Sequence, residues 1–127
     1  MTQKTKCTVI GAGSWGTTLA HLLADKGHET TLWAYETDLV ARMKKSREND
    51  LYLPGIELAE GLKFTSDLAE SVAGAEMILL VCPSQVMRSV VSGLIDHLEP
   101  GVLLVSAAKG IENDSLKLMS ELLEELL

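Results

Sequence analysis

The chain alternates between short apolar runs and longer segments whose apolar positions recur at helical spacing. The short runs with strand composition are Cys7–Ile10, Glu29–Ala34, Lys63–Thr65, Met77–Cys82 and Val102–Val105, and the last two are apolar on both faces, as buried parallel strands are. The helical segments are Ser14–Lys26, a helix capped by Thr37, a short helix after Asp67, a helix capped by Ser84, and a last helix that starts at Asp114 or Ser115. This alternation predicts an α/β fold with a doubly wound, Rossmann-like parallel sheet in three α/β/α layers.

The apolar positions of the predicted helices form one stripe on each. The second helix places Leu39, Val40 and Met43 on its buried side. Asp67 is followed three residues later by Glu70, which is the spacing of a capping box. The stripe of the helix after Ser84 consists of Met87, Val90, Val91, Leu94 and Leu98. The stripe of the last helix consists of Leu116, Met119, Leu122, Leu123 and Leu126.

Composition narrows the class of protein. The 127 residues are 46% hydrophobic and 23% charged, which is an ordinary globular balance, and the formal net charge is −7. That charge argues against nucleic acid or an anionic membrane surface as a partner. Cys7 and Cys82 lie in apolar runs and are interpreted as small buried hydrophobic residues. Because no leader pattern precedes the first strand and no apolar run approaches a membrane span, we expect a soluble, cytoplasmic protein without a metal site.

A glycine-rich loop follows the first strand. Residues 11–16, Gly-Ala-Gly-Ser-Trp-Gly, fit the G-x-G-x-x-G pattern between a strand and a helix. Gly11 permits the tight turn, Gly13 lets a pyrophosphate approach the backbone, and Gly16 lets the helix pack closely. The free N–H groups at the helix start, around Ser14 and Trp15, can then hold the phosphates. The loop predicts a dinucleotide site for NAD or NADP.

Glu36 stands 20 residues after Gly16, at the end of the second strand. A carboxylate at this distance can accept from the ribose hydroxyls of NAD and would repel the 2′-phosphate of NADP. A solvated acid at a helix start explains Glu36 equally well. Tyr35 can border the adenine, and the basic positions Arg42, Lys44, Lys45 and Arg47 can attract a 2′-phosphate, although a solvated helix face is the simpler interpretation of them.

Three further positions are candidates for ligand contact. Trp15 can cover the cofactor or pack on Leu19. Pro83 follows a strand at the carboxyl edge where doubly wound sheets bind ligands, and Lys109 follows the next strand at the same edge. A lysine there can bind an anionic substrate or polarise a carbonyl, while spacing alone favours a surface lysine.

Five ordered blocks of this chain resemble the N-terminal part of bacterial-type NAD(P)-dependent glycerol-3-phosphate dehydrogenases. The blocks are residues 10–17 (IGAGSWGT), 27–34 (with Gly-His and Leu-Trp-Ala), 49–55 (NDLYLPG), 81–84 (VCPS) and 109–112 (KGIE). The resemblance implies an oxidoreductase that interconverts dihydroxyacetone phosphate and sn-glycerol 3-phosphate by hydride transfer and supplies phospholipid synthesis. It also implies that Ser14 and Trp15 contact the cofactor and that Lys109 contacts both cofactor and substrate.

The chain also departs from the family pattern. Family members often carry an arginine after Leu-Trp-Ala, where this chain has Tyr35 and Glu36, and this difference favours NADH or mixed use of both cofactors. The family's proton-transferring lysine lies in a C-terminal helical domain that residues 1–127 do not contain, and no sixth strand follows the last predicted helix. We therefore expect a dinucleotide-binding domain that is a fragment of a longer protein, holds no catalytic residue, and alone does not reduce dihydroxyacetone phosphate.

If the chain is a fragment, surfaces that the rest of the protein would cover are expected to be exposed. An uncovered edge at Val102–Val105, or the apolar stripe at Leu122–Leu126, predicts association of copies of the chain, with a homodimer as one product.

The alternatives to a glycerol-3-phosphate dehydrogenase are the cofactor domain of a related dehydrogenase and a non-catalytic dinucleotide-sensing module. Glu36 would serve sensing as well as catalysis.

Overall fold

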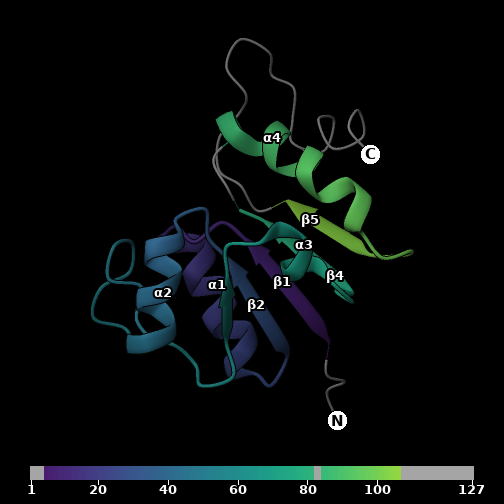
Figure 1. The fold of residues 1–127 in the computed structure, drawn as a ribbon. Helices are drawn as coiled ribbons and strands as arrows, with labels where there is room; N and C mark the ends of the chain where they lie inside the picture. The colour runs from purple at the N-terminus through teal and green to yellow at the C-terminus, as the bar shows by residue number, and fades with distance from the viewer. Residues whose placement is uncertain (1–4, 82–83, 107–127) are drawn as a thin grey trace.

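Five parallel strands form one sheet in the order β3-β2-β1-β4-β5 (Figure 1). The computed structural model describes residues 5–81 and 84–106. The strands are β1 (Lys6–Ile10), β2 (Glu29–Trp33), β3 (Lys63–Thr65), β4 (Met77–Leu80) and β5 (Leu103–Ser106). The helices are α1 (Ser14–Asp25), α2 (Thr37–Ser46), α3 (Leu68–Val72) and α4 (Ser84–Leu94), followed by the 3₁₀ turn η1 (Ile95–His97). The predicted parallel α/β architecture is confirmed, and the predicted last helix lies outside the described residues.

The central strand β1 joins the two halves of the sheet. Val9 pairs with Leu32 of β2 on one side and with Leu79 of β4 on the other. Successive residues of a strand point to opposite faces, so Val9 and Ile10 enter different cores although both are fully buried. The core on the face of Val9 consists of Val9, Ala12, Ala20, Leu32, Ala34, Leu39, Val40, Met43, Leu58, Leu62 and Phe64. The core on the face of Ile10 consists of Ile10, Trp33, Val72, Ala75, Ile78, Leu80, Val90, Val91 and Leu94.

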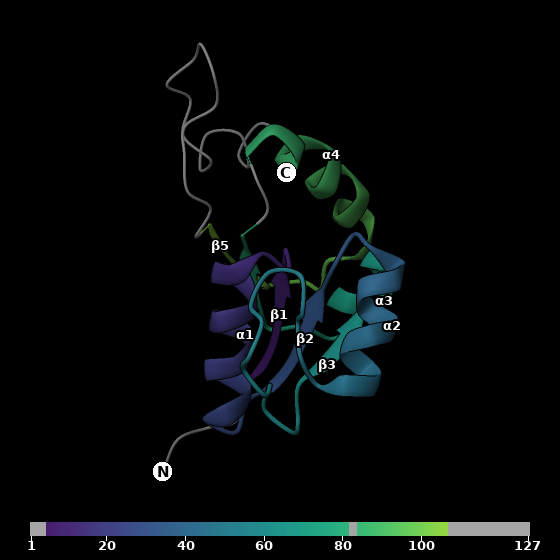
Figure 2. The same cartoon turned by 90° about the vertical axis from the view of Figure 1, so that its left-hand side faces the viewer.

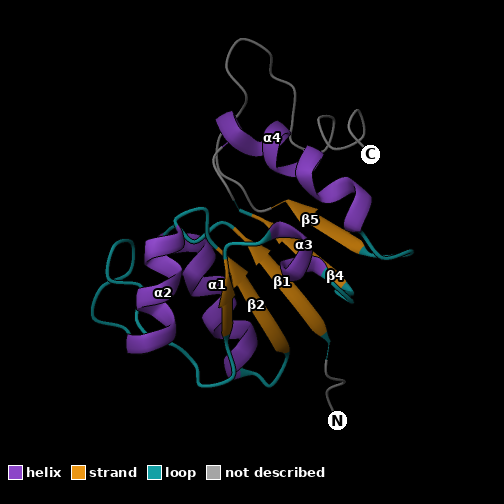
Figure 3. Cartoon of the chain, viewed as in Figure 1, coloured by secondary structure: helices purple, strands orange, loops and turns teal. Residues whose placement is uncertain are grey.

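Helices cover both faces of this sheet (Figures 2 and 3). α1 and α2 supply the core on the Val9 face, and α3 and α4 supply the core on the Ile10 face. The buried positions predicted for α2, Leu39, Val40 and Met43, are confirmed. On α3, the Asp67 carboxylate accepts from the Glu70 N–H at 3.2 Å, so Asp67 caps that helix as predicted. Cys7 is buried, as expected, while Cys82 lies outside the described residues.

Three local predictions are wrong. Ser84 is the first residue of α4 and not its cap. Thr37 is the first residue of α2 and not its cap, because the chain leaves β2 extended through Glu36, whose φ and ψ are −81° and 109°. Val102–Val105 is predicted to be apolar and buried on both faces, yet Leu103 is 58% exposed. In the described part of the chain, β5 is an edge strand of the sheet. Its residues therefore pair with β4 on one side only.

The irregular segment between α2 and β3 is held firmly in place. Arg47 ends α2 in the left-handed region, with a φ of 61°. Its guanidinium donates to the carbonyl oxygens of Ala59 and Glu60 and lies 4.8 Å from the centre of the Phe64 ring. The Leu58 N–H donates to the Arg47 carbonyl at 2.8 Å. These contacts give the loop, residues 48–62, a defined path past the carboxyl end of the sheet.

Candidate functional site: a dinucleotide cavity

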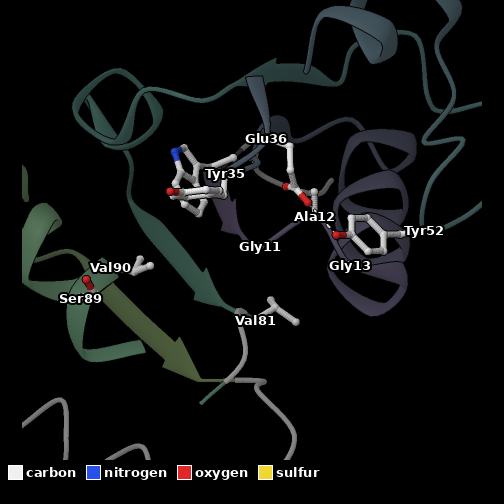
Figure 4. Close-up of a pocket in the computed structure, with 10 residues that line it drawn as sticks. Gly11, Ala12, Gly13, Tyr35, Glu36, Tyr52, Val81, Ser89 and Val90 are labelled. Carbon is white, nitrogen blue, oxygen red and sulfur yellow. Dashed lines mark hydrogen bonds between the residues drawn. The ribbon is translucent and has the colours of Figure 1, made fainter. Parts of the chain in front are cut away.

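A cavity of about 580 Å³ opens at the carboxyl ends of β1 and β2, with Val81 after β4 on its opposite side (Figure 4). This is the point where the strand order reverses, which is where doubly wound sheets bind ligands. The residues that line the cavity are Gly11, Ala12, Gly13, Trp33, Tyr35, Glu36, Tyr52, Val81, Ser89 and Val90. Its wall therefore combines the glycine loop, the end of β2, the 48–62 loop and α4.

The glycine loop has a backbone that other residues cannot follow. Gly11 has a φ of 120°, and its N–H donates to the Trp33 carbonyl at 3.0 Å, which ties the loop to the end of β2. A Cβ placed on Gly16 would lie 1.9 Å from the Gly11 carbonyl oxygen. The close approach expected of Gly16 is therefore confirmed, and its main partner is the glycine loop itself, with the Val81 side chain next at 3.5 Å.

Gly13 leaves open the space that a phosphate needs. A Cβ at Gly13 would meet no atom within 4 Å, although the residue lines the cavity and is exposed. Gly13 is also the N-cap of α1, and the first turn of that helix contains no acidic residue. The first N–H groups of a helix have no partner within it, and the helix dipole favours an anion there. This end of the cavity fits the pyrophosphate of a dinucleotide.

Glu36 and Tyr52 lie side by side at the cavity, although they come from different parts of the chain (Figure 4). The Tyr52 hydroxyl donates to Glu36 Oε2 at 2.6 Å. This bond to a carboxylate, reinforced by burial and by the Glu36 charge, raises the pKa of Tyr52 above its ordinary value. Glu36 is thus held by a specific contact and is not simply a solvated acid at a helix start.

A buried amide holds Tyr52 in position. The Asn49 side chain is fully buried, and its Nδ2 donates to the Ala12 carbonyl and to Thr17 Oγ1, each at 2.8 Å. Its Oδ1 accepts from the Tyr52 N–H at 3.0 Å. Asn49 therefore connects the glycine loop, α1 and the residue that contacts Glu36.

Aromatic residues form the remaining wall. The Trp33 and Tyr35 rings meet edge to face, with 6.5 Å between their centres. Trp33 is 6% exposed, and no described residue accepts from its Nε1–H. A smaller cavity of about 330 Å³ adjoins this wall and is lined by Trp33, Tyr35, Ser66, Leu68, Ser89 and Val90. A flat heterocycle fits such surroundings, since an aromatic face can cover its plane.

The basic residues after Glu36 have other partners or lie away from the cavity. Arg42 Nε donates to both carboxylate oxygens of Asp50 at 3.1 Å, which raises the pKa of Arg42. Arg47 is engaged by the loop carbonyls and Phe64. Lys44 and Lys45 are exposed and are not among the residues lining the cavity. Among the described residues that line the cavity, the charged side chain is thus the carboxylate of Glu36, and none is a cation.

The structure gathers some of the predicted site residues and not others. Gly11, Gly13, Tyr35 and Glu36 line one cavity. Ser14, Trp15 and Gly16 form the first turn of α1 beside it, and Trp15 is 46% exposed. Pro83 and Lys109 lie outside the described residues. The roles of all these residues as ligand contacts stay predictions.

Sequence reasoning from periodicity missed Asn49 and Tyr52. Both lie in a segment without regular secondary structure, where neither strand nor helix period gives a signal. The only signal was their membership of the NDLYLPG block, and that block does not state what its residues contact.

The described residues contain no group of three His, Cys, Asp or Glu side chains placed to hold a metal ion. Within the same residues, no helix is both long and apolar enough to cross a membrane.

Comparison with known proteins identifies the family. The family described as "NAD-dependent glycerol-3-phosphate dehydrogenase N-terminus" matches residues 6–127. A glycerol-3-phosphate dehydrogenase [NAD(P)+] of Syntrophotalea carbinolica is 62% identical over 119 residues, which are 94% of this chain and 36% of that protein. The crystal structure of glycerol-3-phosphate dehydrogenase from Coxiella burnetii superposes with a TM-score of 0.90 at 35% identity, covering 98% of this chain and 38% of that one.

A third relative extends the likeness to a eukaryote. The structure of the Dunaliella salina protein named DsGPDH has a TM-score of 0.87 at 28% identity and is matched over 98% of this chain and 25% of its own length. The chain spans about a third of the length of the curated relatives it matches. The sequence match, the superposed fold and the cavity agree, and the chain belongs to the NAD-dependent glycerol-3-phosphate dehydrogenase family, whose N-terminal part it matches.

Proposed function

We propose that this chain binds NAD(H) and is the dinucleotide-binding part of an enzyme that interconverts sn-glycerol 3-phosphate and dihydroxyacetone phosphate. The observation that carries the proposal is one cavity that is lined both by Gly13, where the space for a Cβ is open, and by the Glu36 carboxylate. The family to which the chain belongs supports the choice of reaction. The bound nicotinamide supplies or accepts the hydride, and the described residues bind and orient the dinucleotide.

Each part of the dinucleotide has a proposed partner. The N–H groups at the start of α1, around Ser14, hold the pyrophosphate, and Gly13 permits its approach. The Glu36 carboxylate accepts from the ribose hydroxyls of the adenosine half. Tyr35 and Trp33 border the adenine. Lys109, which the family resemblance assigns to cofactor and substrate, is proposed to contact the substrate.

The carboxylate at Glu36 supports a preference for NAD(H) over NADP(H). A 2′-phosphate would stand beside a negative charge, and the nearby guanidinium of Arg42 is paired with Asp50. The net charge of −7 adds a general repulsion for the more highly charged nucleotide. The cytoplasm, where the nicotinamide pool and the phosphorylated substrates are dissolved, is the proposed location.

Direct binding tests the nucleotide part of the proposal. The chain has two tryptophans, Trp15 beside the glycine loop and Trp33 in the cavity wall, so NADH binding is expected to quench their fluorescence with saturation. Gly13→Ala is the matched control, because the added methyl group has room in the fold but occupies the phosphate approach. Saturable quenching that G13A abolishes supports the proposal, whereas equal quenching in both proteins contradicts it.

Activity requires the part of the enzyme that the chain does not span. We would join the chain to the remaining two-thirds of the Syntrophotalea carbinolica relative, whose N-terminal part is 62% identical. The chimera is expected to oxidise NADH only when dihydroxyacetone phosphate is present. A chimera that binds NADH but is inactive with this substrate, while reducing another 2-oxo compound, would assign the chain to a related dehydrogenase.

A further inference from the structure

Tyr52 combines two properties that no other described residue shares. Its ring lines the dinucleotide cavity, and its hydroxyl donates to the one carboxylate beside the proposed ribose position, Glu36 Oε2, at 2.6 Å. The ring is 40% exposed, so it stands at the mouth of the cavity and not in a core. A hydrogen bond to an ionised acceptor is among the stronger ones available to a neutral side chain.

The segment that bears Tyr52 is fixed independently of Glu36. The Tyr52 N–H donates to Asn49 Oδ1, and the Leu53 N–H donates to the Asn49 carbonyl at 2.9 Å, which closes a tight turn. Asn49 in turn is buried and bonded to Ala12 of the glycine loop. The phenol is therefore presented to Glu36 by a rigid frame that the phosphate-binding loop shares.

A carboxylate held in this way behaves differently toward the two nucleotides. One oxygen is fixed by Tyr52, while the other, and the remaining lone pairs of both, stay available to a ribose diol. A free Glu36 side chain would rotate away from a 2′-phosphate and so reduce the repulsion. A fixed one cannot rotate away without breaking the bond to Tyr52.

From this geometry we propose that Tyr52 is a positioning residue that determines nucleotide selectivity. Its hydroxyl holds the Glu36 carboxylate toward the ribose, which tightens the binding of NAD(H) and keeps the negative charge where it opposes the 2′-phosphate of NADP(H). This inference rests on the proposed dinucleotide function and goes beyond it, because it assigns selectivity to a residue of the 48–62 loop as well as to Glu36.

The test is a double-mutant cycle on the 127-residue chain with Tyr52→Phe, Glu36→Gln and the double variant. The Kd values for NADH and NADPH are measured by titration calorimetry at one ionic strength, together with those for ADP-ribose and its 2′-phosphate, which lack nicotinamide. Glu57→Gln is the matched control, since Glu57 is exposed, belongs to the same loop and does not line the cavity. Circular dichroism and urea unfolding confirm that each variant is folded.

We expect Y52F to lower the ratio of the NADPH Kd to the NADH Kd by about fivefold or more, approaching the factor of ten that corresponds to about 1.4 kcal/mol. E57Q is expected to leave the ratio unchanged, and Y52F is expected to have no further effect on it in the E36Q background. Equal weakening of both nucleotides by Y52F, or an equal effect with and without Glu36, would overturn the inference. Failure of the unmodified chain to bind either nucleotide would overturn the proposed function itself.

Discussion

The side-chain amide of Asn49 donates to the carbonyl oxygen of Ala12 at 2.8 Å, although 37 positions separate the two residues in the sequence. This bond joins the glycine loop to the only long irregular segment among the described residues. The same amide accepts from the Tyr52 N–H, so one buried side chain sets the position of the glycine loop relative to Tyr52. The geometry of the cavity therefore depends on a residue that does not line it.

Replacement of Asn49 is expected to be costly for folding. Asn49→Ala removes two donated bonds and one accepted bond from a fully buried site, and we expect a loss of about 2–4 kcal/mol in the free energy of unfolding. Thr18→Ala is the control, because that hydroxyl bonds the Ser14 carbonyl on the exposed surface of α1, and its loss is expected to be below about 0.5 kcal/mol. Urea unfolding measures both values, and similar losses for the two variants would contradict this account.

Alanine substitutions at two glycines of the same loop are expected to have different effects, one on folding and the other on NADH binding. In Gly16→Ala the new Cβ would lie 1.9 Å from backbone, so the variant is expected to lose about 3 kcal/mol or more, or not to fold. In Gly13→Ala the Cβ meets no atom within 4 Å and φ is −67°, so stability is expected to change by about 1 kcal/mol or less.

Binding then separates the two glycines. G13A is expected to keep the circular dichroism of the unmodified chain and to raise the Kd for NADH at least about tenfold, a change equivalent to about 1.4 kcal/mol. A stable G16A variant, or a G13A variant that binds NADH normally, would show that the loop does not approach the phosphate as described.

The Tyr52–Glu36 bond is expected to be visible in a pH titration. Tyr35 and Tyr52 are the two tyrosines of the chain, so in Tyr35→Phe the absorbance at 295 nm reports Tyr52 alone. The bond to Glu36, with burial and the carboxylate charge, raises the pKa of Tyr52, and the phenolate is expected to form above the ordinary value of about 10. Adding Glu36→Gln is expected to lower that pKa, because the charge is removed.

The sign of the accompanying stability change follows from linkage. A pKa that is raised in the folded state gives a stabilising contribution that is present below the unfolded pKa and is lost as pH rises through the folded pKa. The difference in stability between Y35F and Y35F/Y52F is therefore expected to shrink at alkaline pH. A Tyr52 pKa that E36Q leaves unchanged would indicate that the bond does not persist in solution.

Cys7 is expected to resist thiol reagents until the chain unfolds. It is 1% exposed, and burial, together with the Glu76 charge, raises its pKa and so reduces the reactive thiolate. With Cys82→Ser the chain contains Cys7 alone. Its reaction with a chromogenic disulfide at pH 8 is expected to be slow in buffer and rapid in urea, and rapid reaction in both would contradict the buried position.

The alternation of strand-like and helix-like patterns of apolar residues along the chain was enough to predict the parallel sheet. Runs such as Met77–Cys82 have no polar face, and only strands of a parallel sheet covered by helices have this pattern. Val9 and Ile10 illustrate the reason, since they face opposite cores from adjacent positions. Element ends were less predictable: Thr37 has the chemistry of a cap, but the extended backbone at Glu36 makes that residue the cap.

The candidate site was predictable only where one segment contains it. Gly11, Gly13 and Gly16 belong to one turn, so their spacing in the sequence is enough to predict the backbone geometry of that turn. The contacts of Tyr52 with Glu36 and of Asn49 with Ala12 join residues 16 and 37 positions apart, and they depend on the path of an irregular loop. Tertiary packing sets that path through Arg47 and Phe64, and no local pattern contains this information.

The glycine loop, Glu36, Asn49 and Tyr52 all lie between positions 11 and 52, in one uninterrupted stretch of the chain. Under the proposed function, the residues that select the nucleotide are therefore encoded in a contiguous part of the gene and can be exchanged or redesigned as a unit. A recombination event that replaces this stretch is then expected to change the nucleotide preference while it leaves β4 and β5 intact.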